Sequence, residues 1–518
     1  MTAIQRGTLV AAILGSSIVF LDGTVVNIAL PRIGAELPAT LIGTLEGQTY
    51  VNSGYLATLA AFLVLAGALG DFYGRRRIFL IGLVGFGITS LACGLAPTLE
   101  LLAVGRVLQG IAGALLVPGS LSIITSTFAG PERGRAFGLW AASTSAVTTL
   151  GPPIGGILVE TVGWRSVFVL NLPLVVLAAW LTIARMQESR DENASGHFDW
   201  LGAGVAVVAI GGLAFGAIRG QDRQWQDPLA FVALGLGALG LIAFPILMAT
   251  RRYPLVPLGL FRIRKFATIN FSTLLIYGAL YANFGFLGLF LQNTLGYSPL
   301  GAAIIGLPTG ILLTILSARI GTVAGRIGAR PFLVAGPLVM AGSLLWWLRV
   351  TADSVPWRAS LSDPSTLVPP LSVFTDPLPA VIGFGVGISL VVAPLTTTLM
   401  SSVPVDRSGL ASAINNAISR VGQPLVAAAI FIAISGSFYA SLAAADPSVD
   451  PSDPSMRAAI QPLNPPPRGT SPVLVDAARE ASTNAFHVAV IVSATMLAAG
   501  AVVNGVGLRE PRARSRAG

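Results

Sequence analysis

The stretch GALGDFYGRRRIFL (residues 67–80) places an aspartate, three glycines and three consecutive arginines between two apolar runs. A second stretch, GTVAGRIGARPFL (residues 321–333), repeats it at a constant offset of 254 positions. The second copy keeps the first and last glycines and one arginine, but has Gly325 in place of Asp71. Each copy follows the second apolar run of a set of six. Such a duplication predicts two homologous helix bundles that face each other, as in many membrane transport folds.

The composition is that of a membrane protein. Of 518 residues, 53% are hydrophobic and 11% are charged, whereas ordinary soluble domains carry about 25% charged residues. A helix needs roughly 20 apolar residues to cross the hydrocarbon core. The sequence therefore predicts an all-α membrane protein with fourteen spans, near residues 8–30, 49–69, 78–96, 101–125, 137–160, 166–185, 200–218, 228–249, 267–291, 300–324, 331–350, 379–401, 409–435 and 485–508.

The placement of the basic residues predicts the topology. A net charge of +9 would suit a nucleic-acid binder, but there is no soluble basic domain to hold a nucleic acid. Lys and Arg concentrate instead in loops after even-numbered spans, most densely at residues 75–77 and 251–265. By the positive-inside rule, those loops and both termini are cytoplasmic. We expect a multi-pass protein of the bacterial inner membrane that contacts lipid, with its first span retained rather than cleaved.

The repeat divides the chain into parts. These are an N-terminal six-helix bundle, two inserted helices, a C-terminal six-helix bundle and a basic cytoplasmic tail, predicted at residues 1–190, 191–250, 251–508 and 509–518. Two long outer loops, 351–378 and 436–484, are rich in Pro, Ser, Asp and Ala. We expect these loops to be solvated and partly disordered. A role as a lid or as a docking segment for a partner is the alternative.

The residue types in the first copy of the repeat have roles that follow from their chemistry alone. Glycines let helices and their turn approach closely, an aspartate can pair with arginine or cap a helix, and arginines anchor a loop at anionic headgroups. The pattern G-x-L-x-D-x-x-G-R-R also resembles the cytoplasmic motif of the major facilitator superfamily. The resemblance implies a conformational latch on the inner face; topological anchoring is the alternative. The latch residues would be Gly67, Asp71, Gly74, Arg75 and Arg76.

Further stretches resemble motifs of the same superfamily. LLAVGRVLQGIAGALLVP (101–118) is similar to its arginine motif, carried here by Arg106, Gln109 and Gly110. GPPIGGILVETVGWRSVFVLNLP (151–173) resembles the motif that marks its antiporters, carried by Gly151, Pro152, Gly155 and Gly156. Together with LDGTVVNIALP (21–31) in the first span, these motifs resemble the drug:proton antiporters of the fourteen-helix branch. The resemblance implies that the fifth helix packs closely and hinges at its glycines.

Asp22 is an ionisable residue inside the first span. Such a group costs roughly 2.5–3.5 kcal/mol at the bilayer centre, so it normally faces the bundle interior and has a function. At about 1.5 Å per residue, Asp22 lies about 21 Å along its helix from Thr8, and Arg106 lies about 8 Å below the outer start of the fourth span. Both are at similar depths, so we expect them to meet. Desolvation and a nearby arginine act on a carboxyl group in opposite directions, so a movement that changes either one makes Asp22 bind or release a proton. A static ion pair is the alternative.

Polar and aromatic residues within the spans are candidates for a substrate cavity. Tyr277 and Tyr281 belong to an aromatic stripe whose faces would suit flat or cationic hydrophobic compounds; packing is the alternative. Arg420 places a cation near the midplane, where it either binds an anionic part of a substrate or pairs with another helix. The remaining candidates are Asn27, Gln109, Asn415 and Asn416. Such residues also serve as hydrogen-bonding contacts between membrane helices.

No sequence pattern supports an enzyme. There is no G-x-x-x-x-G-K-[ST] phosphate loop, and neither histidine lies where a nucleophile triad in a bundle would need it. We expect no metal site and no cofactor, the proton gradient being the energy source. The sequence predicts a monomeric exporter that couples inward proton flow to outward movement of hydrophobic, often cationic, small molecules. The alternatives are an exporter of one dedicated product, such as an antibiotic, siderophore or lipid-like metabolite, and a non-transporting receptor or scaffold.

Overall fold

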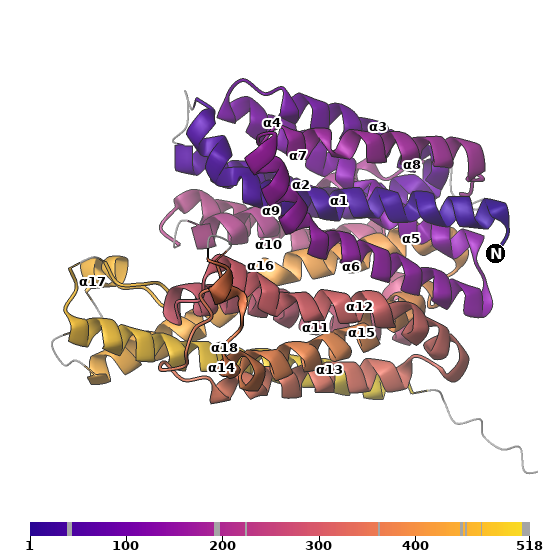
Figure 1. The fold of residues 1–518 in the computed structure, drawn as a ribbon. Coiled ribbons are helices and arrows are strands. Elements are labelled where there is room, and N and C mark those ends of the chain that lie inside the picture. The colour runs from indigo at the N-terminus through magenta and orange to yellow at the C-terminus, as the bar shows by residue number, and fades with distance from the viewer. Residues whose placement is uncertain are drawn as a thin grey trace, which may run out of the picture.

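The structure is a computed structural model that describes residues 1–38, 44–190, 197–222, 225–360, 363–445, 449–450, 453–467 and 469–509. In these ranges the regular structure is helical, apart from one isolated bridge between Ser360 and Asp363. Thirteen helical segments of the described chain are long and apolar enough to cross a membrane. The long helices run in a roughly common direction, as Figure 1 shows, so the chain forms one elongated helical body.

The first bundle is built from α1 to α8. Its helices are α1 (Ala3–Glu36), α2 (Thr44–Tyr73), α3 (Arg75–Gly94), α4 (Leu99–Ala114), α5 (Leu116–Thr127), α6 (Gly130–Thr161), α7 (Ser166–Val169) and α8 (Asn171–Arg185). The predicted fourth span is α4 followed by α5. It is interrupted at Leu115 because Pro118 has no N–H to donate to the carbonyl of Ala114. The sixth span is interrupted at Leu170, three residues before Pro173, for the same reason.

The second bundle begins with a short 3₁₀ turn. Its elements are η1 (Leu258–Arg262), α11 (Arg264–Leu289), η2 (Phe290–Thr294), α12 (Pro299–Ile327), α13 (Arg330–Leu345), η3 (Trp346–Arg349), η4 (Pro364–Leu367), α14 (Leu371–Thr375), α15 (Pro377–Ser401), η5 (Val405–Arg407), α16 (Ser408–Ala445), α17 (Pro454–Ala459) and α18 (Pro472–Gly507). Besides smaller contacts of α5 with α16 and of α6 with α15, the two bundles meet along two main helix pairs, α2 with α16 and α6 with α12. Each pair joins the second long helix of one bundle to the fifth of the other, as the repeat requires.

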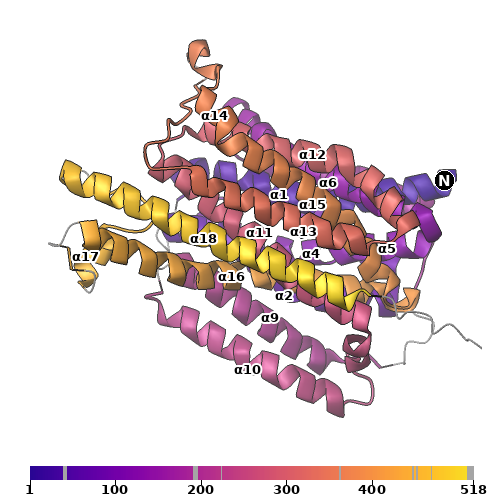
Figure 2. The same ribbon diagram turned by 90° about the horizontal axis from the view of Figure 1, so that it is seen from below.

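The inserted pair lies on one flank of the molecule. It consists of α9 (Trp200–Asp222) and α10 (Pro228–Thr250). α9 packs against α2 and α16, one helix from each bundle, whereas α10 packs mainly on α9 and is the outermost helix in Figure 2. At the end near residue 220, Arg219 forms an ion pair of 2.6 Å with Asp227 and donates to the Tyr50 hydroxyl. The inserted pair is therefore fastened to the first bundle through α2.

The predicted fifth span corresponds to α6, which is not among the thirteen apolar segments. It is 32 residues long, but Ser, Thr, Gly and Pro occupy its middle and lower its apolar character. It is still central, because it packs against both α1 and α12. The count of fourteen spans therefore stays a prediction.

Within the described residues, the two predicted outer loops contain more helix than expected, while many of their side chains are exposed. α16 continues to Ala445 and α18 begins at Pro472, so helices occupy both ends of the predicted 436–484 loop. In the segment that joins them, the carbonyl of Ile460 accepts from the Tyr439 hydroxyl of α16 at 3.1 Å. In the 351–378 loop, Trp357 is buried and its indole donates to Thr366. Prolines that suggested irregular chain instead stand in the first turn of helices, where their missing N–H costs nothing.

Candidate functional site: a buried ion pair beside two cavities

Asp22 and Arg106 meet in the middle of the first bundle. Arg106 Nη1 donates to Asp22 Oδ2, and both side chains are fully buried. The other carboxylate oxygen, Oδ1, accepts from Gln109 Nε2 at 3.1 Å and from Asn171 Nδ2 at 3.0 Å. Arg106 Nη1 also donates to Gln109 Oε1 at 2.7 Å. The four side chains come from α1, α4 and α8, so one carboxylate ties three helices together.

The pair is also bound to α2. Arg106 Nε donates to the carbonyl of Val51 at 3.0 Å, and its guanidinium lies 4.0 Å from the centre of the Tyr55 ring. The Tyr55 hydroxyl in turn donates to the carbonyl of Val19 in α1. One nitrogen, Arg106 Nη2, has no partner among the described residues. The guanidinium is therefore held by Asp22 on one side and by α2 on the other, and its Nη2 nitrogen forms no hydrogen bond among the described residues.

Two glycines of the predicted antiporter motif bring α6 against α1 close to Asp22. A Cβ on Gly151 would overlap the Thr24 hydroxyl, and one on Gly155 would lie 2.9 Å from Val25 Cγ1. The other two motif residues do not share this contact: a Cβ on Gly156 would meet nothing within 4 Å, and Pro152 is only half-buried. Close packing of α6 therefore depends on two of the four predicted residues.

The central cavity lies between the bundles and has a volume of about 360 Å³. Tyr277 and Tyr281 of α11 are on its wall, as are Asn415, Asn416 and Arg420 of α16. The first bundle contributes Phe20 and Trp140, whose rings meet edge to face at 6.5 Å, and a row of hydroxyl groups on α6. Those hydroxyl residues are Thr144, Ser145, Thr148 and Thr149. The wall is thus aromatic and hydroxylated, with one charged side chain.

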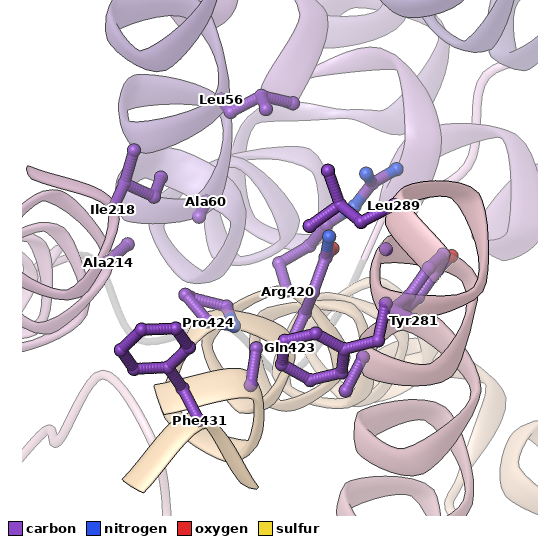
Figure 3. A pocket seen from close by; sticks show the side chains of 14 residues that line it. Leu56, Ala60, Ala214, Ile218, Tyr281, Leu289, Arg420, Gln423, Pro424 and Phe431 are labelled. Atoms are coloured by element: carbon purple, nitrogen blue, oxygen red, sulfur yellow. The ribbon is translucent and has the colours of Figure 1, made fainter. Parts of the chain in front are cut away.

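A second cavity of about 360 Å³ adjoins the first. Tyr281 and Arg420 line both cavities, so the two spaces meet at these side chains. Figure 3 shows Arg420 and Gln423 among mostly apolar neighbours, with Leu56 from α2 and Ile218 from α9 on the opposite wall. The inserted helix α9 therefore contributes directly to a cavity wall.

Two predicted cavity residues do not line either cavity. Gln109 is turned into the Asp22 cluster. Asn27 is exposed, and its amide donates to the carbonyl of Gly23 within α1. It stands about two turns beyond Phe20 on the same side of α1, so the cavity ends before the chain reaches it.

The predicted inner-face latch is a contact between the two bundles. Asp71, at the end of α2, accepts from the backbone N–H groups of Gly409 at 3.1 Å and Leu410 at 2.8 Å, in the first turn of α16. Arg75 donates to Asp71 Oδ1 through Nε and Nη2 at 2.9 and 2.8 Å. Its Nη2 also donates to the carbonyls of Val405 and Asp406. A carboxylate at a helix N-terminus is favourable because the helix dipole is positive there.

The two glycines of the predicted latch have separate structural roles. A Cβ on Gly67 would overlap Ala413, so this glycine permits the close approach of α2 and α16. Gly74 is the N-cap residue directly before α3, and its φ of 109° is a backbone conformation that favours glycine. Glu188, which the sequence analysis did not single out, accepts from the backbone N–H of Arg76 at 3.0 Å and so caps α3 in place of a local side chain.

Arg76 does not join the contact between bundles in the described chain. Its guanidinium donates to the carbonyl of Ile183 near the end of α8. Arg330, the equivalent residue of the second copy, donates to the carbonyl of Gly505 near the end of α18. Equivalent arginines therefore tie the third long helix of each bundle to the sixth. The prediction that Arg76 belongs to the latch is corrected accordingly.

Some site residues were missed by the sequence analysis. Asn171, Phe20 and Trp140 were not proposed, although Asn171 is a polar residue inside a predicted span, and that signal could have found it. Phe20 and Trp140 carry no such signal, because aromatic residues are ordinary in membrane helices.

Two homologous helix bundles that enclose cavities between them define a secondary transporter. A family profile described as "Major Facilitator Superfamily" matches residues 12–427, and the chain belongs to this superfamily. Two solved structures have the same fold: the human organic anion transporter MFSD10 (TM-score 0.58, 13% identity, 96% of this chain and 100% of that one) and the proton:xylose symporter XylE (TM-score 0.58, 15% identity, 96% and 95%). At these identities the likeness supports the fold alone.

Curated relatives are more similar in sequence. The "Multidrug resistance protein Stp" of Mycobacterium tuberculosis is 34% identical over 429 residues, covering 82% of this chain and 75% of that protein. The "Tetracenomycin C resistance and export protein" of Streptomyces glaucescens is 31% identical, covering 81% and 74%. The "Methylenomycin A resistance protein" of Bacillus subtilis is 31% identical, covering 83% and 88%. These relatives are all bacterial proteins named for resistance to antibiotics or drugs.

Proposed function

We propose that this protein is a proton-coupled exporter of hydrophobic small molecules. The names of its relatives support drug efflux, and the cavity between the bundles has the aromatic and hydroxyl-bearing wall expected for such cargo. The observation that carries the proposal is the fully buried Asp22–Arg106 pair, which lies apart from both cavities. Burial of two charges costs several kcal/mol per ion before pairing offsets it. Moving either side chain away from its partner, or neutralising it, would therefore change the free energy of this conformation strongly.

Proton uptake by Asp22 would remove the counter-charge of Arg106. The guanidinium would keep its contacts to Val51 and Tyr55 of α2, while α1 would lose its charged link to α4. Phe20 lies two residues before Asp22 and lines the central cavity. A movement of α1 would therefore change both the protonation site and the cavity wall, which is the coupling an antiporter needs.

The latch at the inner face supplies the second element of the cycle. Asp71 and Arg75 hold the start of α16 against α2, so these contacts must separate before the inner side opens. We place the protein in the cytoplasmic membrane of a bacterium, because its basic loops lie on the latch side and its relatives are bacterial. Both cavities and the ion pair lie within one chain, so we propose a monomer that uses no cofactor beyond the proton gradient.

The test is transport in vesicles with an imposed proton gradient. Wild type, Asp22→Asn and Asp22→Glu are compared over a panel that includes ethidium and several neutral hydrophobic compounds. We expect wild type to move at least one compound, Asp22→Asn to lose gradient-driven movement, and Asp22→Glu to keep part of it. The control is Asp406→Asn, since that carboxylate belongs to no ion pair among the described residues. Wild-type transport by a well-folded Asp22→Asn variant would remove the aspartate from the mechanism.

A narrower function is export of one dedicated product. Two of the relatives are named for single antibiotics, tetracenomycin C and methylenomycin A. The same panel separates the two functions, because a multidrug exporter moves several unrelated compounds whereas a dedicated exporter moves compounds of one chemical type.

A further inference from the structure

Among the described residues that line the two cavities, one side chain is ionised, and it is positive. None of the residues that line either cavity is Asp or Glu, and Arg420 lines both. Asp22 cannot balance this charge, because it is fully buried outside the cavities and is already paired with Arg106. The space available to a substrate therefore has a net charge of +1 on its described walls.

Arg420 is also open for binding. Its guanidinium lies 5.5 Å from the centre of the Phe20 ring, and this stacking uses the flat face rather than the N–H groups. Arg420 forms no ion pair or hydrogen bond with any residue that the structure describes, and its side chain is half-buried rather than sealed from the cavities. A guanidinium carries five N–H donors in a fork that matches the two oxygens of an acidic group.

The surroundings of Arg420 fit an amphipathic ligand. On the side of the central cavity, Tyr277, Tyr281 and Trp140 provide aromatic surface. On the side of the second cavity, the wall is apolar apart from Gln423 and the shared Tyr281. A molecule with its acidic group at Arg420 could place an aromatic or aliphatic body in either space. A cation at the same point would face a like charge with no carboxylate to offset it.

We propose that the cavities select hydrophobic anions, molecules that carry one acidic group on an aromatic or aliphatic body, and that Arg420 binds the acidic group. The assignment rests on the proposed export function for its physiological meaning. It shifts the expected preference away from the cations that the aromatic residues alone would favour.

The probes are two fluorescent compounds that share one ring system. 1-Anilinonaphthalene-8-sulfonate is an anion, and N-phenyl-1-naphthylamine is its neutral counterpart without the sulfonate. Binding of each is measured on purified protein in lipid nanodiscs, with empty nanodiscs subtracted. The variants are Arg420→Gln and Arg420→Lys. The control is Arg319→Gln, because Arg319 is an exposed residue of α12 that lines neither cavity.

We expect Arg420→Gln to weaken anion binding about tenfold or more, the size of a lost charge-assisted hydrogen bond. Binding of the neutral probe should change little, Arg420→Lys should recover part of the anion affinity, and Arg319→Gln should match wild type. Equal losses for both probes, unchanged anion binding in Arg420→Gln, or no specific anion binding by wild type would each overturn the assignment.

Transport of the same probes separates this inference from the proposed function. If wild type binds the anion through Arg420 but a proton gradient moves neither probe nor the wider panel, the site stands and the export function fails. If a gradient moves the probes equally in wild type and Arg420→Gln, export stands and the anion site fails.

Discussion

At the scale of single residues, two buried aspartates are each bonded to one arginine, but they lie in different parts of the molecule. Asp22 and Arg106 are both inside the first bundle, and their partners come from α1, α2, α4 and α8. Asp71 and Arg75 are almost as buried, but their other bonds cross to the second bundle. The same pair of residue types therefore ties helices together within one bundle in the first case and joins the two bundles in the second.

The Asp22 pair leads to a prediction about stability. Asp22→Asn and Arg106→Gln should each lower the free energy of unfolding by about 3–5 kcal/mol, because removing one partner leaves the other charge buried and unpaired. The double variant should be more stable than either single variant, since it leaves no charge behind. Thermal unfolding of all four proteins in the same detergent gives the coupling between the sites. Additive losses in the double variant would show that the pair is not a closed unit.

At this scale, the sequence predicted the depth of a residue along its helix better than the neighbour that its side chain faces. A rise of about 1.5 Å per residue put Asp22 and Arg106 at the same height, and the structure pairs them. The same rise cannot say which neighbour a side chain faces, because that depends on how the helices rotate against each other. Gln109 was therefore proposed for the cavity, but it faces Asp22. Arg420 was proposed as a cation near the midplane, and its place between two cavities needed the packed structure.

At the scale of helices, α6 packs against α1 beside the ion pair and against α12 of the second bundle. Gly151 and Gly155 lie against Thr24 and Val25 of α1, two and three residues after Asp22. Near its start, α6 meets α12 of the other bundle, where Gly134 packs against Gly321. α6 therefore contacts α1 beside the ion pair and also contacts the second bundle.

This packing predicts different effects for two neighbouring glycines. Gly151→Ala should slow transport and lower stability by about 1–3 kcal/mol, the usual range for overpacking, because the new methyl group overlaps the Thr24 hydroxyl. Gly156→Ala is the matched control, since it adds the same methyl group where nothing lies within 4 Å. Transport rates and thermal unfolding of both variants test the difference. Adding Thr24→Ala to Gly151→Ala should restore part of the loss, and equal effects of the two glycine variants would contradict the packing argument.

The helices also show where composition misleads. Prolines and small residues in the 436–484 segment suggested an irregular loop, yet helix formers such as Ala follow Pro472 and extend α18 beyond the predicted span. Conversely, the interruptions at Leu115 and Leu170 follow from proline positions that the sequence already contains. These two prolines accompany a break, but Pro31, Pro245 and Pro308 lie inside helices that continue through them, so a proline in an apolar run does not by itself predict an interruption.

At the scale of the whole molecule, the repeat produces symmetry in packing but not in the latch. Gly67 permits close contact between α2 and α16, and Gly321 does the same for α12 and α6. Asp71, however, has no counterpart, because the second copy has Gly325 there. Among the described residues, the charged contact of this motif is therefore on the α2–α16 side of the interface, whereas Gly134 packs against Gly321 on the α6–α12 side.

This asymmetry makes Asp71 the residue whose loss should open the inner face. In Asp71→Asn the carboxylate charge is gone, so Arg75 loses its ion pair and the start of α16 loses its charged cap. We expect hydrogen exchange at the amides of Gly409 and Leu410 to rise about tenfold or more, as for lost bonds to a charged group. Turnover should slow, while substrate binding should change little because Asp71 lines neither substrate cavity.

Asp406→Asn is the control for that measurement, because it removes a carboxylate from the same loop but leaves the carbonyl that accepts from Arg75. Its exchange rates should match wild type. Unchanged exchange at Gly409 and Leu410 in Asp71→Asn would mean that glycine packing holds the inner face closed by itself. Faster exchange with normal turnover would mean that opening this face does not limit the cycle, and the latch would then anchor the topology alone.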